Sequence, residues 1–530
     1  MSELNLRPQV GPGEILPYAA ARFPDKVGLV VGSRRLTYRE LDSYARNVAT
    51  SLCKLGIGEG DVVSLYGQNS WQWIVSYHGA LRAGAIVNPV NVMLTGPELE
   101  FVLNDCRSKA LLAGAQQAEV AANAAQRTGS VELVVTFGDQ PLSGARTFES
   151  LLSDGADQDL SATDWAGTEA LCSIGYTSGT TGHPKGAMQS QQAVLLNCAY
   201  TATMHGRTAD DVVVTALPAP HAYGNVAINS AFLAGGTVVL MERFDAGSAL
   251  RLIEAEQATI FEGVPAMYSM MIADAAYDTA DLSSLRISTV GGQTFPPSLL
   301  ERWENRTKKP LLELWGMTEV AGLGATHTPF APSSPGSIGI ALPGTELRVR
   351  ALDGEGEAQV GEPGELMVRG PLVMLGYYGN PDATAEALQS DGWLRTGDIA
   401  TCDSTGHFFV VDRMKDMLVT AGYNVYPAEI ERVVGGHPDV AMVAVGRRAD
   451  DVRGEIAVAY VVARPGTDPT AESILEFCRA GLAAYKRPRD VIFVPDLPKT
   501  SSGKLMRRKL ADLELPRRGG ADRLHPSPAG

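Results

Sequence analysis

The sequence of 530 residues lacks several features that define common protein classes. No stretch approaches 18 consecutive apolar residues, so we expect no membrane-spanning helix. The first residues, MSELNLRPQVGPGEILPYAA, lack the apolar region of a signal peptide, and the final PSPAG matches no recognised address signal. The six cysteines include no CxxC pair, which disfavours a zinc site. We therefore expect a cytoplasmic protein with reduced cysteines and no integral membrane contact.

Basic residues are outnumbered by acidic ones. The chain has 45 Lys and Arg against 60 Asp and Glu, a formal charge of −15, which argues against a general nucleic-acid partner because phosphate backbones attract basic surfaces. Apolar residues make up 45% and charged residues 20%, as in an ordinary globular protein. A chain of this length is too long for one hydrophobic core, so we expect two or more domains.

Apolar strands alternate with amphipathic helices up to about residue 300. The segment TYRE, Thr37–Glu40, is a capping box that predicts a helix start, and the next short strand is VVSLY. This alternation predicts parallel sheets with helices on both faces. Between Pro332 and Asp412, frequent Gly and Pro with short strand-like pieces predict a small antiparallel unit. After Asp412 the alternation resumes, with Pro427 at the first position of a helix.

One loop has the composition of a phosphate-binding segment. The stretch Tyr176–Ser190, YTSGTTGHPKGAMQS, is not a nucleoside-triphosphatase P-loop, because Lys185 follows Gly182 by only three residues and Gly186 comes next. Its glycines allow backbone N–H groups to approach an anion, its hydroxyls add donors, and Lys185 adds a positive charge. The alternative interpretation is a solvated Gly/Ser/Thr linker, which would hold for a less specific run.

The loop resembles the phosphate-binding motif of the adenylate-forming (AMP-binding) superfamily. This superfamily includes acyl-CoA synthetases, the adenylation domains of peptide synthetases, and beetle luciferases. Further segments resemble other motifs of the family in the family's order: LWGMTEV (Leu314–Val320), GWLRTGDIA (Gly392–Ala400), DRMKDMLVTAGYNVYPAEIE (Asp412–Glu431) and PKTSSGKLMRRKL (Pro498–Leu510). Together they span nearly the whole chain, and their joint occurrence makes the resemblance specific.

The resemblance implies an α/β fold and a two-step reaction. The expected fold is a large N-terminal domain (1–412) of two doubly wound α/β subdomains plus a small β-barrel-like unit, then a small mobile α+β domain (413–510). Residues 511–530 are expected to be disordered. The implied enzyme is an ATP-dependent acyl-CoA synthetase that forms acyl-AMP with release of pyrophosphate and passes the acyl group to coenzyme A. ATP, Mg²⁺ and coenzyme A are the implied cofactor and co-substrates, and the protein is expected to be a monomer or homodimer.

The same resemblance assigns roles to residues of the large domain. The implied catalytic residues are His221 at the gating position near the carboxylate, Thr318 at the α-phosphate, and Glu319 as a ligand of Mg²⁺. Thr177 is a second implied metal ligand. Trp315, where most relatives have Tyr, is implied to stack on adenine, and Asp398 to bind the ribose hydroxyls. The other implied nucleotide-binding residues are Ser178, Gly179, Thr180, Thr181, Gly182, Lys185, Gly291, Gly292, Gln293 and Gly316.

In the small domain, the resemblance implies two alternating sites. Lys504 is expected to act in catalysis at the α-phosphate during adenylation. Arg413 is expected to reach the nucleotide, and Lys415 marks the hinge about which the domain turns. After the turn, the loop at Gly422 and Tyr423 is expected to line the passage for coenzyme A. Three further residues are either contacts for its 3′-phosphate or, more simply, a solvated basic edge: Lys486, Arg487 and Arg489.

The acid itself is less well defined by the sequence. The stretch HAYGNVAINSAFLAGG lacks the Asp that holds an amino-acid substrate, which disfavours a peptide-synthetase adenylation domain. Glu262 precedes a Gly-Val-Pro turn, from which it can face away. The expected lining is apolar or aromatic and consists of Tyr223, Val226, Ala227, Val264 and Met267. It favours a fatty acid, with an aryl or alicyclic acid as the alternative, and no cation for a dicarboxylate is identified.

Two other functions remain as alternatives. An acyl-AMP ligase could load a carrier protein in trans instead of coenzyme A, since no carrier-like segment follows the small domain. A non-catalytic binding protein is disfavoured because Lys185, Glu319, Asp398 and Lys504 are all present.

Overall fold

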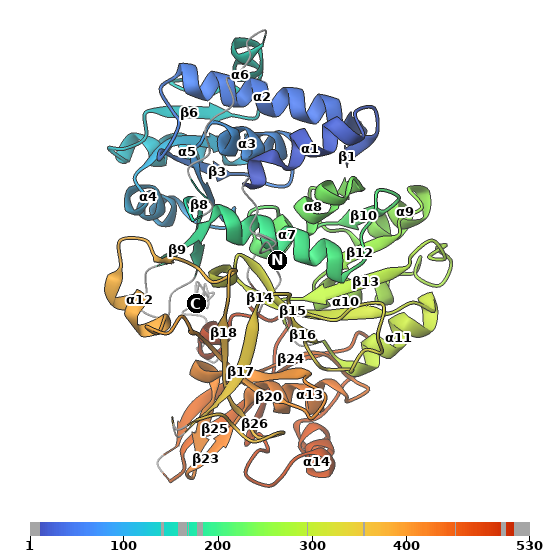
Figure 1. Cartoon of the computed structure of the whole chain (residues 1–530). Helices are drawn as coiled ribbons and strands as arrows, with labels where there is room; N and C mark the ends of the chain where they lie inside the picture. Colours follow the sequence, from blue (N-terminus) through green and yellow to red (C-terminus); the bar gives the residue numbers. More distant parts are fainter. Residues whose placement is uncertain are drawn as a thin grey trace, which may run out of the picture. The chain divides into compact units, whose positions relative to one another are not determined.

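The structure is a computed structural model, and the residues it describes are 11–138, 143–156, 167, 169–177, 184–293, 295–352, 354, 356–450, 452–499 and 505–513. The chain divides into two compact units, Met1–Val410 and Val411–Gly530 (Figure 1). The first unit carries two large, mostly parallel sheets, and the second is smaller, so the expected α/β fold class is confirmed. Within the described residues, no helix has both the length and the apolar character needed to cross a membrane.

The first large sheet has eight strands and is parallel except at one edge. In spatial order its strands are β19 (Gly376–Tyr377), β9 (Lys185–Ser190), β8 (Leu171–Thr177), β4 (Ile86–Pro89), β3 (Val62–Tyr66), β5 (Ser108–Ala113), β6 (Leu133–Thr136) and β7 (Arg146–Thr147). Strand β9 is antiparallel to both β8 and β19. Strand β19 comes from the region expected to form only the small antiparallel unit, so that region also completes a distant sheet.

Six helices precede or connect strands of this sheet, and local sequence explains where they begin. They are α1 (Ile15–Arg22), α2 (Tyr38–Lys54), α3 (Trp71–Arg82), α4 (Gly96–Asp105), α5 (Ala118–Arg127) and α6 (Phe148–Gly155). The predicted capping box of α2 is present, because the Thr37 side chain accepts from the Glu40 N–H and the Glu40 carboxylate accepts from the Thr37 N–H. The apolar face of α2 is buried in the core together with α3.

The second large sheet has nine strands and is parallel in its centre. Its spatial order is β16 (Ile340–Ala341), β15 (Gly322–Thr326), β14 (Leu311–Met317), β13 (Ile287–Gly291), β12 (Ile260–Gly263), β10 (Val212–Thr215), β11 (Thr237–Leu240), β1 (Val27–Val31) and β2 (Arg34–Thr37). Its helices are α7 (Gln191–Met204), α8 (Ala222–Ala234), α9 (Ala246–Ala255), α10 (Pro265–Ala273) and α11 (Pro297–Thr307). Helix α7 contacts strands of both large sheets and runs between them in Figure 1.

The predicted antiparallel unit is a four-stranded sheet. Its strands are β17 (Glu346–Ala351), β18 (Gly364–Arg369), β20 (Leu394–Cys402) and β21 (Phe408–Arg413). Helix α12 (Pro381–Ala387) lies in the chain between β19 and β20. The inner residues of this sheet pack with Trp315 and Ala325 of the nine-stranded sheet.

The second unit is a five-stranded sheet with two helices. The strands are β22 (Leu418–Thr420), β23 (Tyr423–Val425), β24 (Val440–Asp450), β25 (Gly454–Ala463) and β26 (Asp490–Phe493), and the helices are α13 (Pro427–Gly435) and α14 (Ala471–Gly481). Helix α13 begins at the predicted Pro427. Buried Leu510 is followed by a short 3-10 helix, Ala511–Leu513, at which the described chain ends.

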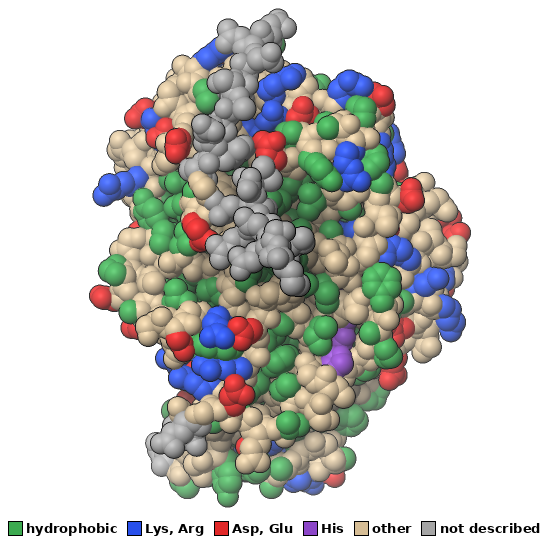
Figure 2. Space-filling model, in the orientation of Figure 1, with side chains coloured by type: hydrophobic (Ala, Val, Ile, Leu, Met, Phe, Trp, Pro, Cys, Tyr) green, Lys and Arg blue, Asp and Glu red, His purple; other side chains and the backbone are tan. Residues whose placement is uncertain are grey.

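Charge is mixed on the molecular face drawn in Figure 2. Lys and Arg side chains are interspersed with Asp and Glu side chains there, and apolar side chains lie between them. The negative total charge of the sequence is therefore not gathered into a single-sign field on this face.

One buried carboxyl makes stability depend on pH. Glu313 lies on β14, only 8% of it is exposed, and its Oε2 accepts a hydrogen bond of 2.7 Å from the Gly336 N–H. Burial raises the pKa of Glu313 to about 7, and the carboxylate of Glu304 adds to the rise while the Gly336 N–H opposes it. Since the folded pKa exceeds the unfolded value, the native state binds more protons, and stability falls as pH rises toward 7.

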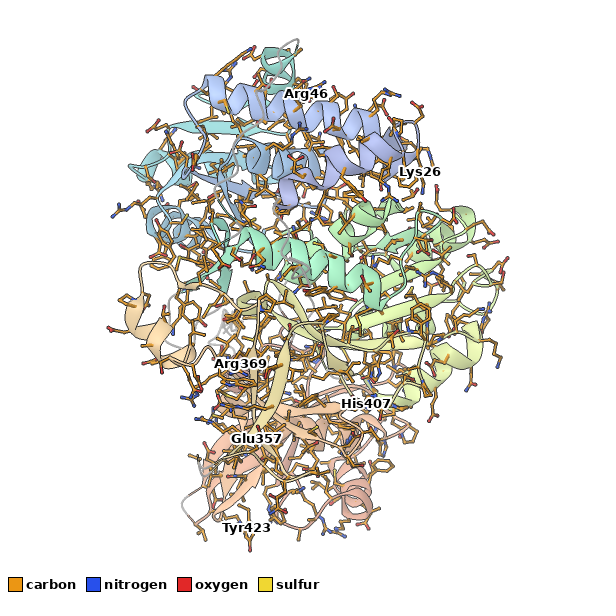
Figure 3. The ribbon with its side chains drawn as sticks, viewed as in Figure 1. Lys26, Arg46, Glu357, Arg369, His407 and Tyr423 are labelled. Atoms are coloured by element: carbon orange, nitrogen blue, oxygen red, sulfur yellow. The ribbon has the colours of Figure 1, made fainter. Side chains whose placement is uncertain are left out.

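We expect Glu313→Gln to stabilise the protein at pH 8 and to change little at pH 4. The amide keeps the acceptor for Gly336 but carries no charge, so the gain at pH 8 should be roughly 3 kcal/mol in the free energy of unfolding. Urea unfolding at both pH values measures it. Glu357→Gln, at an exposed position labelled in Figure 3, is the control and should show no such pH dependence. An equal effect of Glu313→Gln at both pH values would contradict the burial argument.

Candidate active site

Part of the predicted site lies at the carboxyl ends of β13 and β14, next to β12. These strands are parallel neighbours, with Glu262 opposite Thr289 and Gly291 opposite Leu314. Ligands of open parallel sheets bind at this edge. Gly291 is buried there, and an added Cβ would lie 2.2 Å from Cδ1 of Leu314 and 3.2 Å from the Leu314 carbonyl oxygen, so a larger residue would have to displace the Leu314 side chain. Gly292 follows, exposed and with φ +91°, and Gln293 is half-buried.

Strand β14 continues past this edge as the segment expected to hold adenine and magnesium. It pairs antiparallel with β15, with an irregularity between Trp315 and Gly316. A Cβ on Gly316 would lie 2.0 Å from the carbonyl oxygen of Gly322, so only glycine fits. The chain then turns through a 3-10 helix, Thr318–Val320, and leaves it at Ala321 with φ +55°.

Three contacts fix this turn against the eight-stranded sheet. Gln189 Nε2 donates to the Thr318 carbonyl at 2.8 Å, and its Oε1 accepts from the Ser173 hydroxyl at 2.5 Å. The Met374 N–H donates to the Glu319 carbonyl at 2.8 Å. The Thr318 methyl group packs against Gly175, where an added Cβ would lie only 2.5 Å from Thr318 Cγ2. The position of Thr318 is thus set by the strand that precedes the phosphate loop.

The same turn brings Glu319 close to the start and end of that loop. Glu319 is 7% exposed, and its Oε1 accepts a hydrogen bond of 2.9 Å from the Tyr377 hydroxyl. Burial raises the pKa of Tyr377, and the neighbouring Glu319 raises it further. Lys185 Nζ lies 5.3 Å from the centre of the Tyr377 ring. Thr177, the last residue of β8, pairs with Lys185 across the two antiparallel strands.

These donors fit a magnesium ion that is held partly by nucleotide. Mg²⁺ prefers oxygen ligands and usually takes one or two carboxylates together with substrate phosphates. Glu319 supplies a carboxylate from the turn after β14, and Thr177 supplies a hydroxyl from the end of β8. No group of three or more His, Cys, Asp or Glu side chains is arranged for a metal in the part of the chain that the structure describes. Substrate phosphate oxygens and water would complete the coordination.

The residues expected to bind adenine and ribose are in direct contact. Trp315 Nε1 donates to Asp398 Oδ2 at 2.8 Å, and these residues are 7% and 2% exposed. Asp398 lies on β20, 83 positions further along the chain. Its backbone N–H donates to the Thr396 hydroxyl at 3.0 Å. The sequence predicted a role for each residue but not the hydrogen bond between them.

His221 and Tyr223 lie at the start of α8. His221 is half-buried and caps the helix, with its N–H donating to the Pro218 carbonyl at 2.9 Å and its carbonyl accepting from the Asn225 N–H at 2.8 Å. Gly224 must be glycine, because an added Cβ would lie 2.2 Å from the Pro218 oxygen. The half-buried Tyr223 reaches the nine-stranded sheet, where its hydroxyl lies 2.7 Å from the Thr289 hydroxyl.

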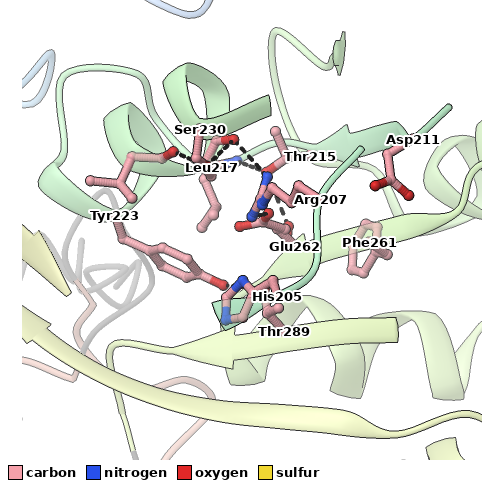
Figure 4. A network of polar contacts seen from close by, with 12 residues as sticks. His205, Arg207, Asp211, Thr215, Leu217, Tyr223, Ser230, Phe261, Glu262 and Thr289 are labelled. Carbon is pink, nitrogen blue, oxygen red and sulfur yellow. Dashed lines mark hydrogen bonds and ion pairs between the residues drawn. The ribbon is translucent and has the colours of Figure 1, made fainter. Parts of the chain in front are cut away.

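A buried ion pair that the sequence did not reveal lies behind Tyr223. Arg207 pairs with Glu262, and their side chains are 0% and 1% exposed (Figure 4). Arg207 Nη1 also donates to the Ala227 carbonyl at 3.0 Å. Glu262 therefore points to the α8 side of the sheet rather than away. No motif in the sequence marks Arg207. The available signal is that an arginine between a helix and an apolar strand needs an acidic partner if it is buried.

Several predicted residues lie outside the described part of the chain. They are Ser178, Gly179, Thr180, Thr181, Gly182 and Lys504. Their roles stay predictions.

In the second unit, one arginine ties together the segment expected to be the hinge. Arg507 contacts Asp412 at 3.4 Å, Asp416 at 3.0 Å and Glu431 of α13 at 2.6 Å. Burial raises the pKa of Asp412 to about 6, although Arg507 beside it favours the charged form. Arg507, which belongs to the segment Pro498–Leu510, thus ties the expected hinge segment to α13.

The other predicted residues of the second unit differ in exposure. Arg413 is half-buried, and Lys415 is exposed, while its carbonyl accepts from Arg447 Nη2 at 2.7 Å. Gly422, with φ +83°, forms the turn between β22 and β23. Tyr423 is 57% exposed, stacks on Tyr485 at 4.7 Å, and lies at the outer edge of its unit in Figure 3.

The three basic residues considered for coenzyme A have contacts within the second unit. Lys486 Nζ binds both oxygens of Glu429, at 2.7 and 2.8 Å. Arg487 Nε donates to the Leu482 carbonyl at 2.9 Å, after α14. Arg489 Nη2 donates weakly to a carbonyl at 3.4 Å. Lys486 is thus paired with an acidic side chain, whereas Arg489 is exposed, and the role of the three residues stays a prediction.

Comparison with known proteins places these features in a wider group. A family model described as AMP-binding enzyme matches residues 16–378, and one described as AMP-binding enzyme C-terminal domain matches residues 429–504. An indoleacetate–CoA ligase of Aromatoleum aromaticum is 37% identical over 92% of this chain and 95% of its own length. A long-chain-fatty-acid–CoA ligase of Yersinia pestis is 35% identical over 95% of this chain and 94% of its own.

A solved structure is similar over almost the whole chain. The anthranilate CoA ligase AuaEII, in complex with anthranoyl-AMP, has a TM-score of 0.90 and 28% sequence identity, over 97% of this chain and 99% of that chain.

We expect Gly175→Ala to impair ATP–pyrophosphate exchange by about a hundredfold, because the new methyl group must displace Thr318 and a shift of about 1 Å is enough for such a loss. The backbone of Gly175 lies in a strand, so alanine adds no conformational strain. Gly129→Ala is the control, since nothing lies within 4 Å of its added Cβ. Exchange at the wild-type rate in Gly175→Ala would show that the position of Thr318 is not critical.

Proposed function

The chain belongs to the AMP-binding enzyme family, and from this membership we propose that it activates an aryl carboxylic acid and transfers the acyl group to coenzyme A. The general activity is that of an AMP-forming acid–CoA ligase, which uses ATP, Mg²⁺ and coenzyme A. The class of acid and the role of each residue are the proposal.

The reaction requires two displacements at different centres. In the first, a carboxylate oxygen of the acid attacks the α-phosphorus of ATP, the bond to the bridging oxygen breaks, and pyrophosphate leaves. In the second, the sulfur of coenzyme A attacks the acyl carbon and AMP leaves. The first step brings two anions together, so positive charge and precise alignment are the main requirements.

The contacts of the first unit support a nucleotide site along β14 and its turn. Lys185 would hold the β- and γ-phosphates, Thr318 would donate to the α-phosphate, and Asp398 would accept from the ribose hydroxyls. Glu319 and Thr177 would hold Mg²⁺, which neutralises phosphate charge when it is bound. His221 would lie beside the carboxylate of the acid. Three contacts support this arrangement: Tyr377 lies against both Glu319 and Lys185, Gln189 binds the Thr318 carbonyl, and Trp315 binds Asp398.

The buried polar layer behind Tyr223 carries the proposal of an aryl acid. If the carboxylate lies at His221, the body of the acid extends along α8 toward Tyr223. There the tyrosine hydroxyl is bound to Thr289, and the Arg207–Glu262 pair lies behind it (Figure 4). A long alkyl tail that extended past Tyr223 would have to separate this buried pair, and parting two buried charges is costly. A flat ring can end against Tyr223 with favourable aromatic packing.

Two of the residues expected to line the acid-binding site pack inside the hydrophobic core instead. Val226 and Ala227 are completely buried, Val226 against Gly322 and Ala227 in the cluster around Phe261. Val264 and Met267 are only 8% and 9% exposed. The half-buried Tyr223 is thus the member of the set best placed to touch an acid. The relatives include ligases named for indoleacetate and anthranilate, which agrees with an aryl substrate.

A fatty acid is the second candidate. The Yersinia pestis relative is a long-chain-fatty-acid–CoA ligase, and its sequence identity to this chain, 35%, is close to the 37% of the indoleacetate–CoA ligase. The sequence alone favours this class through its apolar lining. Coenzyme A is proposed as the acceptor in preference to a carrier protein, since the relatives named above are CoA ligases.

A panel of acids tests the substrate class. We expect kcat/KM for indoleacetate, phenylacetate or a hydroxycinnamate to exceed that for dodecanoate and hexadecanoate by at least about tenfold. Tyr223→Leu should reduce this preference, because it removes the ring and frees space. The measurements are AMP formation with and without coenzyme A, and acyl-CoA formation when coenzyme A is present. A preference for hexadecanoate would establish the fatty-acid candidate instead.

The two half-reactions should separate in variants of the second unit. Lys504→Ala should reduce acyl-adenylate formation by about 10²–10³ and spare thioester formation from supplied acyl-adenylate. Gly422→Leu should do the reverse, since bulk at the turn would close the passage for coenzyme A. Lys499→Ala is the control for Lys504→Ala, since Lys499 pairs with Asp496. Gly466→Leu is the control for Gly422→Leu, because Gly466 has φ +84° and leucine there imposes the same backbone strain elsewhere. Equal losses in both half-reactions for Lys504→Ala would contradict alternating sites.

A further inference from the structure

We propose that Trp315 is a positioning residue of the nucleotide site, whose indole N–H holds the Asp398 carboxylate in the orientation that receives the ribose hydroxyls. The inference rests on the proposed role of Asp398. Its starting observation is the hydrogen bond of 2.8 Å from Trp315 Nε1 to Asp398 Oδ2. This role is separate from stacking on adenine, the function expected of an aromatic residue at this position.

The indole ring is held firmly enough to orient another group. An added Cβ on Gly324 would lie 2.4 Å from Cζ3 and 2.9 Å from Cε3 of Trp315, so the ring lies directly against the backbone of β15. Trp315 also belongs to a buried cluster that joins the nine-stranded and four-stranded sheets, with Ala325, Val349, Leu366, Ala400 and Phe408. A ring packed in this way cannot rotate without disturbing two sheets.

The backbone of Asp398 is held independently of its side chain. Its N–H donates to the Thr396 hydroxyl at 3.0 Å, and that hydroxyl donates to the Leu366 carbonyl at 2.7 Å. The donor on Trp315 restrains rotation of the Asp398 carboxylate. The ring N–H also provides a hydrogen bond to a carboxylate that is 98% buried, where a missing donor is costly.

The side chain at this position therefore has to supply a donor at a particular place. Phenylalanine fills much of the volume but has no N–H, and the hydroxyl of tyrosine lies at the far end of its ring. The isosteric analogue 3-benzothienylalanine keeps the bicyclic shape and replaces N–H by sulfur. It separates loss of the donor from loss of packing.

The test compares ATP with 2′-deoxy- and 3′-deoxy-ATP in ATP–pyrophosphate exchange. We expect Trp315→Phe, and the benzothienyl variant, to lose about ten- to a hundredfold in kcat/KM for ATP and several-fold at most for the deoxy analogues. The preference for ATP over the analogues should therefore shrink, as it should in Asp398→Asn. In the Asp398→Asn background, Trp315→Phe should cause no further loss of this preference.

Trp303→Phe is the matched control. Trp303 is also fully buried in the first unit, and its Nε1 donates at 3.0 Å to a neutral acceptor, the Ser288 hydroxyl. It should lower the melting temperature without changing the ratio between ATP and the deoxy analogues. If Trp315→Phe fails to fold, the benzothienyl variant decides the question.

Two outcomes are distinguishable. Equal losses for ATP and both analogues in the Trp315 variants, with a normal effect of Asp398→Asn, would overturn the positioning role and leave stacking alone. An unchanged ribose preference in Asp398→Asn would instead overturn the proposed role of Asp398 itself, and with it the premise of the inference.

Discussion

The hydrogen bond between Gln189 and the Thr318 carbonyl joins the two large sheets at the candidate active site. Gln189 belongs to the eight-stranded sheet, and Thr318 to the turn between β14 and β15 of the nine-stranded sheet. Its geometry depends on two glycines, because Gly175 leaves room for the Thr318 methyl group and Gly316 lets β14 approach β15. The phosphate segment and the metal-binding turn come from different sheets, so their relative position depends on this contact.

Buried charge is concentrated around the same edge of the nine-stranded sheet. Glu262, Glu313 and Glu319 are all less than 9% exposed, and each lies on or just after a strand of the β12–β14 group. They are compensated differently: Glu262 by Arg207, Glu313 by a raised pKa and a backbone N–H, and Glu319 by the Tyr377 hydroxyl. Such groups destabilise a fold unless they are satisfied, and their presence together is typical of a functional site.

Local signals in the sequence were sufficient for much of the fold. The capping box at Thr37 and the proline at position 427 mark helix starts that the structure confirms, since capping depends on residues within one turn. The pairing of Tyr377 with Ala187 in the eight-stranded sheet was not foreseen. It joins segments nearly two hundred positions apart, and a two-residue strand carries almost no pattern of its own.

In the candidate site, too, the motifs identify residues, whereas the contacts between distant residues appear only in the structure. Motif resemblance named Trp315, Glu319 and Asp398, but it gives no information on contacts among them, and the Trp315–Asp398 bond emerged only in three dimensions. The Arg207–Glu262 pair was missed because its members lie 55 positions apart and neither belongs to a motif. The role of each site residue stays a prediction.

The arginine clamp of the second unit has a consequence for how this chain can be recombined with its relatives. Arg507 pairs with carboxylates from the expected hinge segment, Asp412 and Asp416, and from α13, Glu431, so these three pieces form one electrostatic unit. A chimera that took its last residues from a donor without an equivalent arginine would leave Asp412, Asp416 and Glu431 facing one another. Crossover points for domain shuffling should therefore lie before Asp412, so that all four charges are inherited together.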